Sequence, residues 1–166
     1  SAQFNDVGLL TAPDGRRYAV AVMIGERPDT RSYSLLDSAA DGLYRITVKR
    51  EAHPGQPGGT VSNWLHDHAG PGTVLRAAPP AGDFFLDRST DAPVVLVSGG
   101  VGLTPMVSML ESIAATSRDR PTWYVHGTLN GHTHAMRDHV RGLVAGDGKL
   151  KVQTFYAQPD AQDRPG

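Results

Sequence analysis

The pattern of hydrophobic and polar residues changes near residue 91. Before that point, apolar and polar residues alternate over short stretches, most clearly over residues 44–49. This period of two predicts β-strands with one buried face. Further strands are expected over residues 7–11, 17–24, 31–36, 73–78 and 83–86. Turns rich in Pro, Gly and Asp separate them, which favours a small antiparallel barrel or sandwich.

After residue 92, helical periods alternate with apolar strands. The continuously apolar residues 94–97 predict a parallel strand that is covered on both faces. Further strands are expected around residues 121–127 and 149–157. Two helices between them have apolar faces, the first with Met106, Leu110 and Ile113 and the second with Met136, Val140, Leu143 and Val144, ending near Gly146. This βαβαβ order predicts a parallel sheet with right-handed crossovers.

The stretch Ser98-Gly-Gly-Val-Gly-Leu-Thr-Pro105 joins the first of these strands to its helix. Thr104 is expected to cap this helix and Pro105 to be its first residue. Such a turn directs backbone N–H groups and the positive end of a helix dipole at one point, which suits a phosphate. The turn matches neither the full dinucleotide fingerprint nor a P-loop. An ordinary strand–helix turn is therefore the alternative to a nucleotide site.

Two earlier segments have a similar character. In Arg31-Ser-Tyr-Ser34, Arg31 and Tyr33 share one strand face and suit a ligand with both a phosphate and a flat ring. A salt-bridged arginine beside a half-buried tyrosine is the alternative. Residues 58–66 predict a short amphipathic helix that Ser62 caps. Its N-terminus suits a second phosphate, although a helix that only packs against a barrel has the same pattern.

Composition excludes several classes of function. The chain has 16 basic and 17 acidic residues, so neither nucleic acid nor an anionic membrane is expected as a partner. The absence of cysteine excludes disulfides and thiolate metal sites. No signal peptide or apolar run of membrane-spanning length is visible, so a cytoplasmic location is expected.

The seven histidines do not form a metal-binding pattern. His66 and His68 are two residues apart and would not face each other on a helix. We expect the histidines to be surface residues and predict no metal site. Ser98 follows a strand but lacks the glycine context of a nucleophile elbow, so no hydrolytic triad is expected.

Taken in order, five segments resemble the ferredoxin–NADP reductase superfamily, most closely the reductase part of flavohaemoglobins (nitric oxide dioxygenases). They are Arg31-Ser-Tyr-Ser34, Val48-Lys-Arg-Glu51, Val61-Ser-Asn-Trp-Leu-His66, Ala78-Pro-Pro-Ala-Gly-Asp-Phe84 and Ser98-Gly-Gly-Val-Gly-Leu-Thr-Pro105. The resemblance implies a Greek-key antiparallel FAD-binding β-barrel over residues 1–91. A truncated parallel βαβαβ NAD(P)-binding α/β domain would follow over residues 92–166.

The resemblance also implies the cofactors FAD and NAD(P)H and a set of residues that contact them. On the FAD side these are Tyr18, Arg31, Ser32, Tyr33, Ser34, Val48, Glu51, Val61 and Ser62. On the NAD(P)H side they are Gly100, Val101, Gly102, Leu103, Thr104 and Pro105. Ser34 near flavin N5 and Thr104 near the nicotinamide would be the catalytic pair. The family reaction is hydride transfer from NAD(P)H to flavin N5, with electrons passing to a haem or globin domain or another acceptor in trans.

This chain departs from the family pattern in its first residues and in its extent. Residues 5–24 resemble a class A β-lactamase hairpin, but no lactamase active-site motif follows. A truncated sheet would expose an edge through which the chain self-associates. The alternative functions are a truncated, non-catalytic nucleotide-binding or electron-transfer partner module, and a nucleotide-binding α/β protein without flavin.

Overall fold

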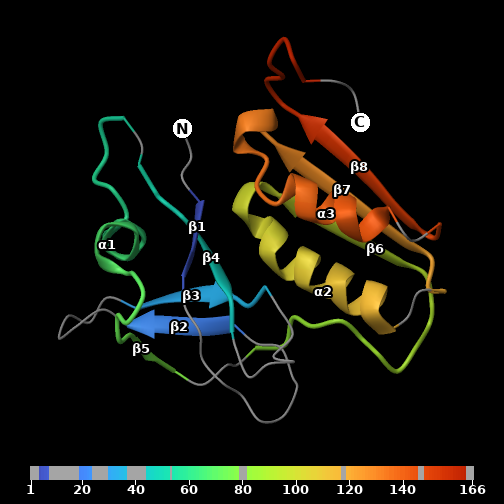
Figure 1. Cartoon of the computed structure of the whole chain (residues 1–166), viewed down its shortest axis with the longest axis horizontal. Coiled ribbons are helices and arrows are strands. Elements are labelled where there is room, and N and C mark those ends of the chain that lie inside the picture. The colour runs from blue at the N-terminus through green and yellow to red at the C-terminus, as the bar shows by residue number, and fades with distance from the viewer. Residues whose placement is uncertain are drawn as a thin grey trace. The chain divides into compact units, whose positions relative to one another are not determined.

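The computed structural model describes residues 4–7, 19–23, 30–36, 44–52, 54–78, 82–116, 119–145 and 148–163 (Figure 1). Only the backbone is described for residues 4–7, 19–23 and 30. The chain divides into two compact units at the bond between Phe85 and Leu86. The division expected from the sequence lies a few residues further along, after residue 91.

The first unit is built from short antiparallel strands and one helix. Its elements are β1 (Phe4–Val7), β2 (Ala19–Met23), β3 (Thr30–Ser34), β4 (Ile46–Lys49), α1 (Thr60–His68) and β5 (Arg76–Ala77). β1 pairs with β4, and β2 lies between β3 and β5. A bridge between Leu35 and Ile46 links the end of β3 to the start of β4. The strand predicted over 73–78 is thus only two residues long, and no strand forms over 83–86.

The hairpin suggested for residues 5–24 is wrong in its pairing. β1 and β2 belong to different sheets and pair with β4 and with β3 and β5, respectively. β1 therefore pairs with a strand that is distant along the chain, whereas β2 pairs with the strand that follows it and with the distant β5. Residues 8–18, which would form the tip of the hairpin, lie outside the described residues.

The core of the first unit lies between β4 and α1. Its buried residues are Leu35, Tyr44, Ile46, Val48, Val61 and Leu65. Val61 and Leu65 are four residues apart and so lie on one face of α1. Ser62 does not cap this helix, contrary to the sequence prediction, because the helix begins at Thr60 with Gly59 as the N-cap. Ser62 instead lies in the first turn and is buried.

The second unit is a parallel α/β sheet, as the sequence predicts. Its elements are β6 (Val94–Gly99), the 3-10 turn η1 (Gly100–Gly102), α2 (Leu103–Thr116), β7 (Thr122–Thr128), the 3-10 turn η2 (Gly131–Thr133), α3 (Arg137–Val144) and β8 (Leu150–Tyr156). The strands follow the order β6-β7-β8, and both pairs are parallel. Both helices lie on the same face of this sheet (Figure 1).

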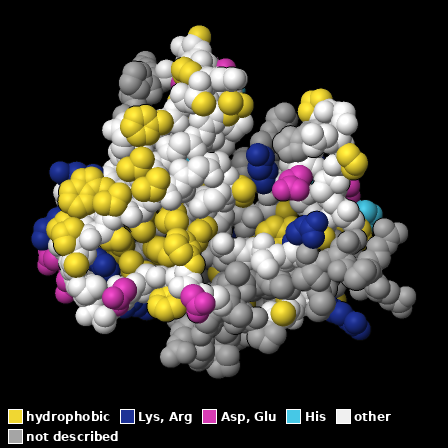
Figure 2. Space-filling view, turned by 180° about the vertical axis from the view of Figure 1, so that it is seen from behind, with side chains coloured by type: hydrophobic (Ala, Val, Ile, Leu, Met, Phe, Trp, Pro, Cys, Tyr) yellow, Lys and Arg dark blue, Asp and Glu magenta, His cyan; other side chains and the backbone are white. Residues whose placement is uncertain are grey.

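The other face of the sheet is open among the described residues, which corrects the prediction of a strand buried on both sides. Val95 and Val97 are 60% and 61% exposed, whereas Leu96 between them is buried. Trp123 and Phe155 are also exposed hydrophobic residues of this sheet. Figure 2 shows hydrophobic side chains gathered on this unit. The burial of the strand therefore alternates, since both helices cover the face toward which Leu96 points.

The helices of the second unit differ in how deeply they pack. α2 buries Leu103, Val107, Leu110 and Ile113, while Met106 is only half-buried. α3 buries only Val140. Met136, predicted on the apolar face of this helix, precedes it as the N-cap with a φ of 58°. No helix in the described part of the chain is long and apolar enough to cross a membrane.

Candidate functional site

The glycine turn lies at the carboxyl end of β6, where ligands bind in open α/β sheets. Gly100 has a φ of +52°, a left-handed conformation that favours glycine. The chain then passes through η1 into α2, and the Leu103 N–H bonds to the carbonyl oxygens of Gly100 and Val101. A Cβ placed at Gly99, Gly100 or Gly102 would meet nothing within 4 Å. The outer side of the turn is therefore open to a ligand.

A ligand at this turn would contact its backbone rather than the side chains of its last residues. Thr104 is 3% exposed, and its Oγ1 donates to the Val101 carbonyl oxygen at 3.2 Å. It lies inside α2, which begins at Leu103, so it is not the N-cap, and Pro105 is not the first helical residue. The helix, which follows a 3-10 turn, therefore begins two residues earlier than predicted. Pro105 still lies in the first turn, where its missing N–H costs nothing.

Five polar side chains lie together beneath this turn, and we call them the Ser98 cluster: Ser98, Tyr124, His126, His134 and Tyr156. The Ser98 hydroxyl shares hydrogen bonds with the Tyr124 hydroxyl at 2.9 Å and with His126 Nδ1 at 2.8 Å. The His126 and His134 rings are 4.9 Å apart between centroids. His134 Nδ1 shares a hydrogen bond of 2.9 Å with the Tyr156 hydroxyl.

The Ser98 cluster corrects the expectation of surface histidines. His126 is 1% exposed, and burial lowers the pKa of its imidazole. Burial also raises the pKa of the Tyr124 hydroxyl, which the hydrogen bond from Ser98 opposes. Sequence reasoning missed this cluster, although Thr122, Tyr124 and His126 alternate along a strand whose even positions face the helices. His126 Nε2 has no hydrogen-bond partner among the described residues, so Ser98 and His126 do not form a hydrolytic triad.

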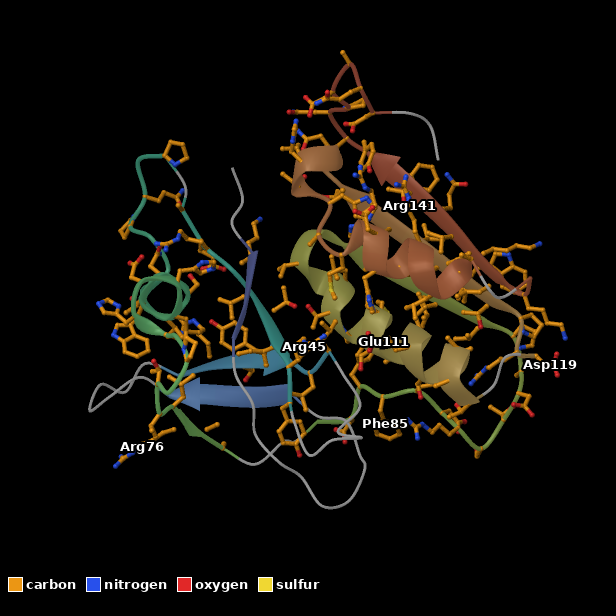
Figure 3. All side chains as sticks on the ribbon, viewed as in Figure 1. Arg45, Arg76, Phe85, Glu111, Asp119 and Arg141 are labelled. Carbon is orange, nitrogen blue, oxygen red and sulfur yellow. The ribbon has the colours of Figure 1, made fainter. Side chains whose placement is uncertain are left out.

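A cavity of about 490 Å³ lies beside β8. Its polar lining comes from His134, Arg137, Arg141, Gln153, Thr154, Tyr156 and Asp163 (Arg141 is labelled in Figure 3). His134 thus links the buried cluster to an accessible groove. The described residues contain no group of three or more His, Asp or Glu side chains that could hold a metal ion.

In the first unit, Tyr33 lies close to both Arg31 and Glu51. Burial raises the pKa of the Tyr33 hydroxyl, and the charge of Glu51 raises it further, while that of Arg31 lowers it. Arg31 and Ser32 are exposed, and Tyr33 and Ser34 are half-buried. This arrangement places a cation beside a partly accessible aromatic ring. Tyr18, the other predicted aromatic contact, lies outside the described residues.

The start of α1 packs closely on the strand end at Glu51. The Gly59 N–H donates to the Glu51 carbonyl oxygen at 3.0 Å. A Cβ on Gly59 would lie 2.7 Å from both Glu51 Oε2 and Ser62 Oγ, so a larger residue would force these side chains to shift. Ser62 Oγ donates to the Gly59 carbonyl oxygen at 3.3 Å and accepts from the Glu51 N–H at 3.2 Å. Its hydroxyl is thus engaged internally.

The hydrophobic candidates of this unit have packing positions. Val48 and Val61 are both buried in its core. Their side chains are therefore not placed to contact a ligand, and any contact would come from their backbone. Sequence reasoning also missed Arg50, whose guanidinium donates to Asp67 Oδ1 at 2.6 Å and to Asn63 Oδ1 at 3.1 Å. These two bonds hold α1 against the end of β4.

Comparison with known proteins gives concordant matches. Residues 96–166 match the family described as "Oxidoreductase NAD-binding domain". A flavohemoprotein of Xylella fastidiosa (strain Temecula1) is 48% identical over 147 residues, which is 89% of this chain and 35% of that protein. A flavohemoprotein of Bacillus cereus is 45% identical over 133 residues, covering 80% of this chain and 33% of the relative. This chain thus spans about a third of the length of these relatives.

A solved structure resembles nearly the whole chain. The flavohem-like FAD/NAD-binding domain of nitric oxide dioxygenase from Vibrio cholerae aligns with a TM-score of 0.80 and 26% identity, covering 98% of this chain and 74% of that one. A ferredoxin-NADP+ reductase from Plasmodium falciparum has a TM-score of 0.78 at 12% identity, which shows the fold alone. With these relatives and this fold, the chain belongs to the ferredoxin–NADP reductase superfamily and is a relative of the flavohemoproteins.

Proposed function

We propose that this chain is an FAD-dependent oxidoreductase module that takes reducing equivalents from NAD(P)H. The observation that carries the proposal is the open glycine turn at the carboxyl end of the parallel sheet. In this proposal the first unit is a Greek-key FAD-binding barrel, and the second is the NAD(P)-binding domain.

The glycine turn fits the pyrophosphate of a nicotinamide nucleotide. A Cβ at Gly100 or Gly102 meets nothing within 4 Å, so there is room for a ligand against the backbone. The positive end of the α2 dipole points at this space and favours an anion. Gly100, Val101 and Gly102 would bind through their backbone. Leu103, Thr104 and Pro105 would shape the first turn of the helix.

The first unit fits FAD through a cation and a ring on β3. Arg31 is exposed and would bind a phosphate by charge-assisted hydrogen bonds, and Ser32 is exposed beside it. Tyr33 would pack against the flavin or its ribityl chain. The N–H groups at Val61 and Ser62 would face the second phosphate, while Val48 and Glu51 would support them from β4. Tyr18 would be a further contact to the flavin.

Two residues are proposed to act near the reacting atoms. When bound, FAD supplies an electron sink that accepts hydride from the nicotinamide and passes electrons onward. Ser34 would orient the flavin with a hydrogen bond from its half-buried hydroxyl. Thr104 would act through its position rather than through its hydroxyl, because that hydroxyl already donates a hydrogen bond to the Val101 carbonyl oxygen. The electron acceptor would be a haem or globin domain, or another acceptor in trans.

Cofactor binding tests this proposal before any turnover is measured. The full chain is incubated with FAD or FMN, freed of excess cofactor and titrated by flavin fluorescence. We expect FAD to bind more tightly than FMN, because two separate elements would each hold a phosphate. Arg31→Ala should weaken FAD binding by about thirtyfold, which is the loss of affinity expected when one charge-assisted hydrogen bond is removed. Arg45→Ala, which alters an exposed arginine immediately before β4, is the matched control.

Flavin titration together with NAD(P)H binding and flavin reduction separates the alternatives. A chain that binds no flavin but does bind NAD(P)H would be a nucleotide-binding α/β protein. A chain that binds FAD but is not reduced by NADH or NADPH would be a non-catalytic electron-transfer partner module. Equal FAD affinity in wild type and Arg31→Ala would show that Arg31 is not a phosphate ligand.

A further inference from the structure

The Ser98 cluster has no part in the cofactor contacts described above. All three strands of the parallel sheet contribute to it: Ser98 from β6, Tyr124 and His126 from β7, and Tyr156 from β8. His134 joins it from the segment between η2 and α3. The cluster therefore ties together three strands and a connecting loop directly below the glycine turn.

Ser98 is the point at which the cluster reaches the turn. It lies opposite His126 in the register of β6 and β7, and the next pair in this register is Gly99 with Gly127. The Ser98 hydroxyl has two hydrogen bonds, at 2.9 Å and 2.8 Å, to side chains of β7. Glycines have wide conformational freedom, so the start of a glycine turn needs such an anchor.

A histidine at position 126 is unfavourable for the stability of the fold. The ring is 1% exposed, and its Nε2 has no hydrogen-bond partner among the described residues. A buried polar atom without a partner destabilises a fold, whereas an apolar ring of similar size would not. The hydrogen bond of Nδ1 to Ser98 is the interaction that an apolar ring would lose. This bond therefore gives the position a reason to hold histidine.

We propose that Ser98 and His126 are positioning residues for the nicotinamide nucleotide. The bond between them fixes the end of β6, so that the glycine turn is held in the conformation that receives the pyrophosphate. Holding a loop ready for its ligand removes an ordering cost from binding. The inference rests on the proposed function, since it concerns the same NAD(P)H site. It assigns this site a second layer of residues that do not touch the ligand.

Paired substitutions at Ser98 test the inference. Ser98→Ala removes both hydrogen bonds, while Ser98→Thr keeps the hydroxyl in a residue that strands favour. The full chain loaded with FAD is used, and NADPH affinity, KM, kcat per bound FAD and FAD content are measured. We expect Ser98→Ala to raise Kd and KM for NADPH about tenfold, with kcat per bound FAD within twofold of wild type. Ser98→Thr should recover most of the affinity.

His139→Gln is the control for changing a histidine of the same unit. His139 is exposed and bonds to Glu111 Oε1 of α2 at 2.6 Å, and Glu111 is not a member of the Ser98 cluster (Glu111 is labelled in Figure 3). A merely structural role of Ser98 would give the opposite split. The active fraction and the FAD content would fall while KM stayed constant, and that result would overturn the inference.

Milder variants keep the test decisive if Ser98→Ala does not fold. Tyr124→Phe removes one of the two bonds to Ser98, and His126→Asn places an amide near the position of Nδ1. We then expect Tyr124→Phe to raise KM for NADPH and His126→Asn to keep it near the wild-type value. If wild type binds NADPH and no variant changes KM, only the inference fails. If wild type does not bind NADPH, the proposed function fails first and the inference falls with it.

Discussion

His134 makes the stability of the second unit depend on pH. Burial lowers the pKa of its imidazole from 6.5 to about 4, and the neighbouring charges of His126, Arg137 and Arg141 act in the same direction. The unfolded chain therefore binds this proton more tightly than the folded chain. Stability from this group is fully present above about pH 6.5 and is lost as the pH falls toward about 4.

The magnitude follows from the two pKa values. A fall in pKa from 6.5 to about 4 corresponds to at most about 3 kcal/mol of unfolding free energy. His134 is only half-buried, and solvent screens the charges around it. We therefore expect about half of that value, roughly 1.5 kcal/mol, between about pH 7.5 and about pH 4.5.

Urea unfolding at these two pH values measures the effect. The comparison is with His134→Asn, which keeps a polar atom near Tyr156 but does not titrate. Wild type should lose roughly 1.5 kcal/mol more than this variant on acidification, because contributions of the carboxylates cancel in the difference. Equal losses in wild type and His134→Asn would refute the reasoning.

Two further predictions concern the glycine turn and the open sheet face. Gly100→Ala should destabilise the protein by roughly 1 kcal/mol, since its φ is +52°, whereas Gly102→Ala in the same turn should cost little; thermal unfolding compares them. Val97→Lys should lower self-association, because Val97 is a 61% exposed hydrophobic residue on the open face. Sedimentation velocity tests this against Phe84→Lys, a change at a similarly exposed residue, and equal association of both variants would contradict it.

The hydrophobic periodicity of the sequence predicted the order of the helices and strands better than it predicted which faces are buried and which strands pair. The βαβαβ sequence of the second unit follows from local patterns, and each predicted strand and helix is present. Local pattern does not reveal which faces are covered, so Val95 and Val97 were wrongly expected to be buried. β1 pairs with β4, which is distant along the chain, and β2 pairs with β3 and β5. The resemblance of residues 5–24 to a hairpin therefore predicted the wrong pairing.

In the candidate site, too, a feature formed by contiguous residues was predicted, whereas features that depend on the folded structure were not. The glycine turn was recognisable because its residues are contiguous in the sequence. The caps at Ser62 and Thr104 were misplaced because each helix begins before the predicted residue, and a 3-10 turn precedes the second helix. The Ser98 cluster was missed because its five residues are brought together only by the sheet register and by the segment after η2.

The central claim is that the glycine turn binds the nicotinamide nucleotide. Anaerobic mixing of the FAD-loaded chain with NADPH or NADH, followed by flavin absorbance, tests it in wild type and Gly102→Val. A Cβ at Gly102 meets nothing of the protein within 4 Å, so this variant should fold and hold FAD normally. We predict flavin reduction in wild type and at least tenfold weaker NAD(P)H binding in Gly102→Val. Equal nucleotide affinity in the two proteins, or no reduction of FAD-loaded wild type by either nucleotide, would contradict the account.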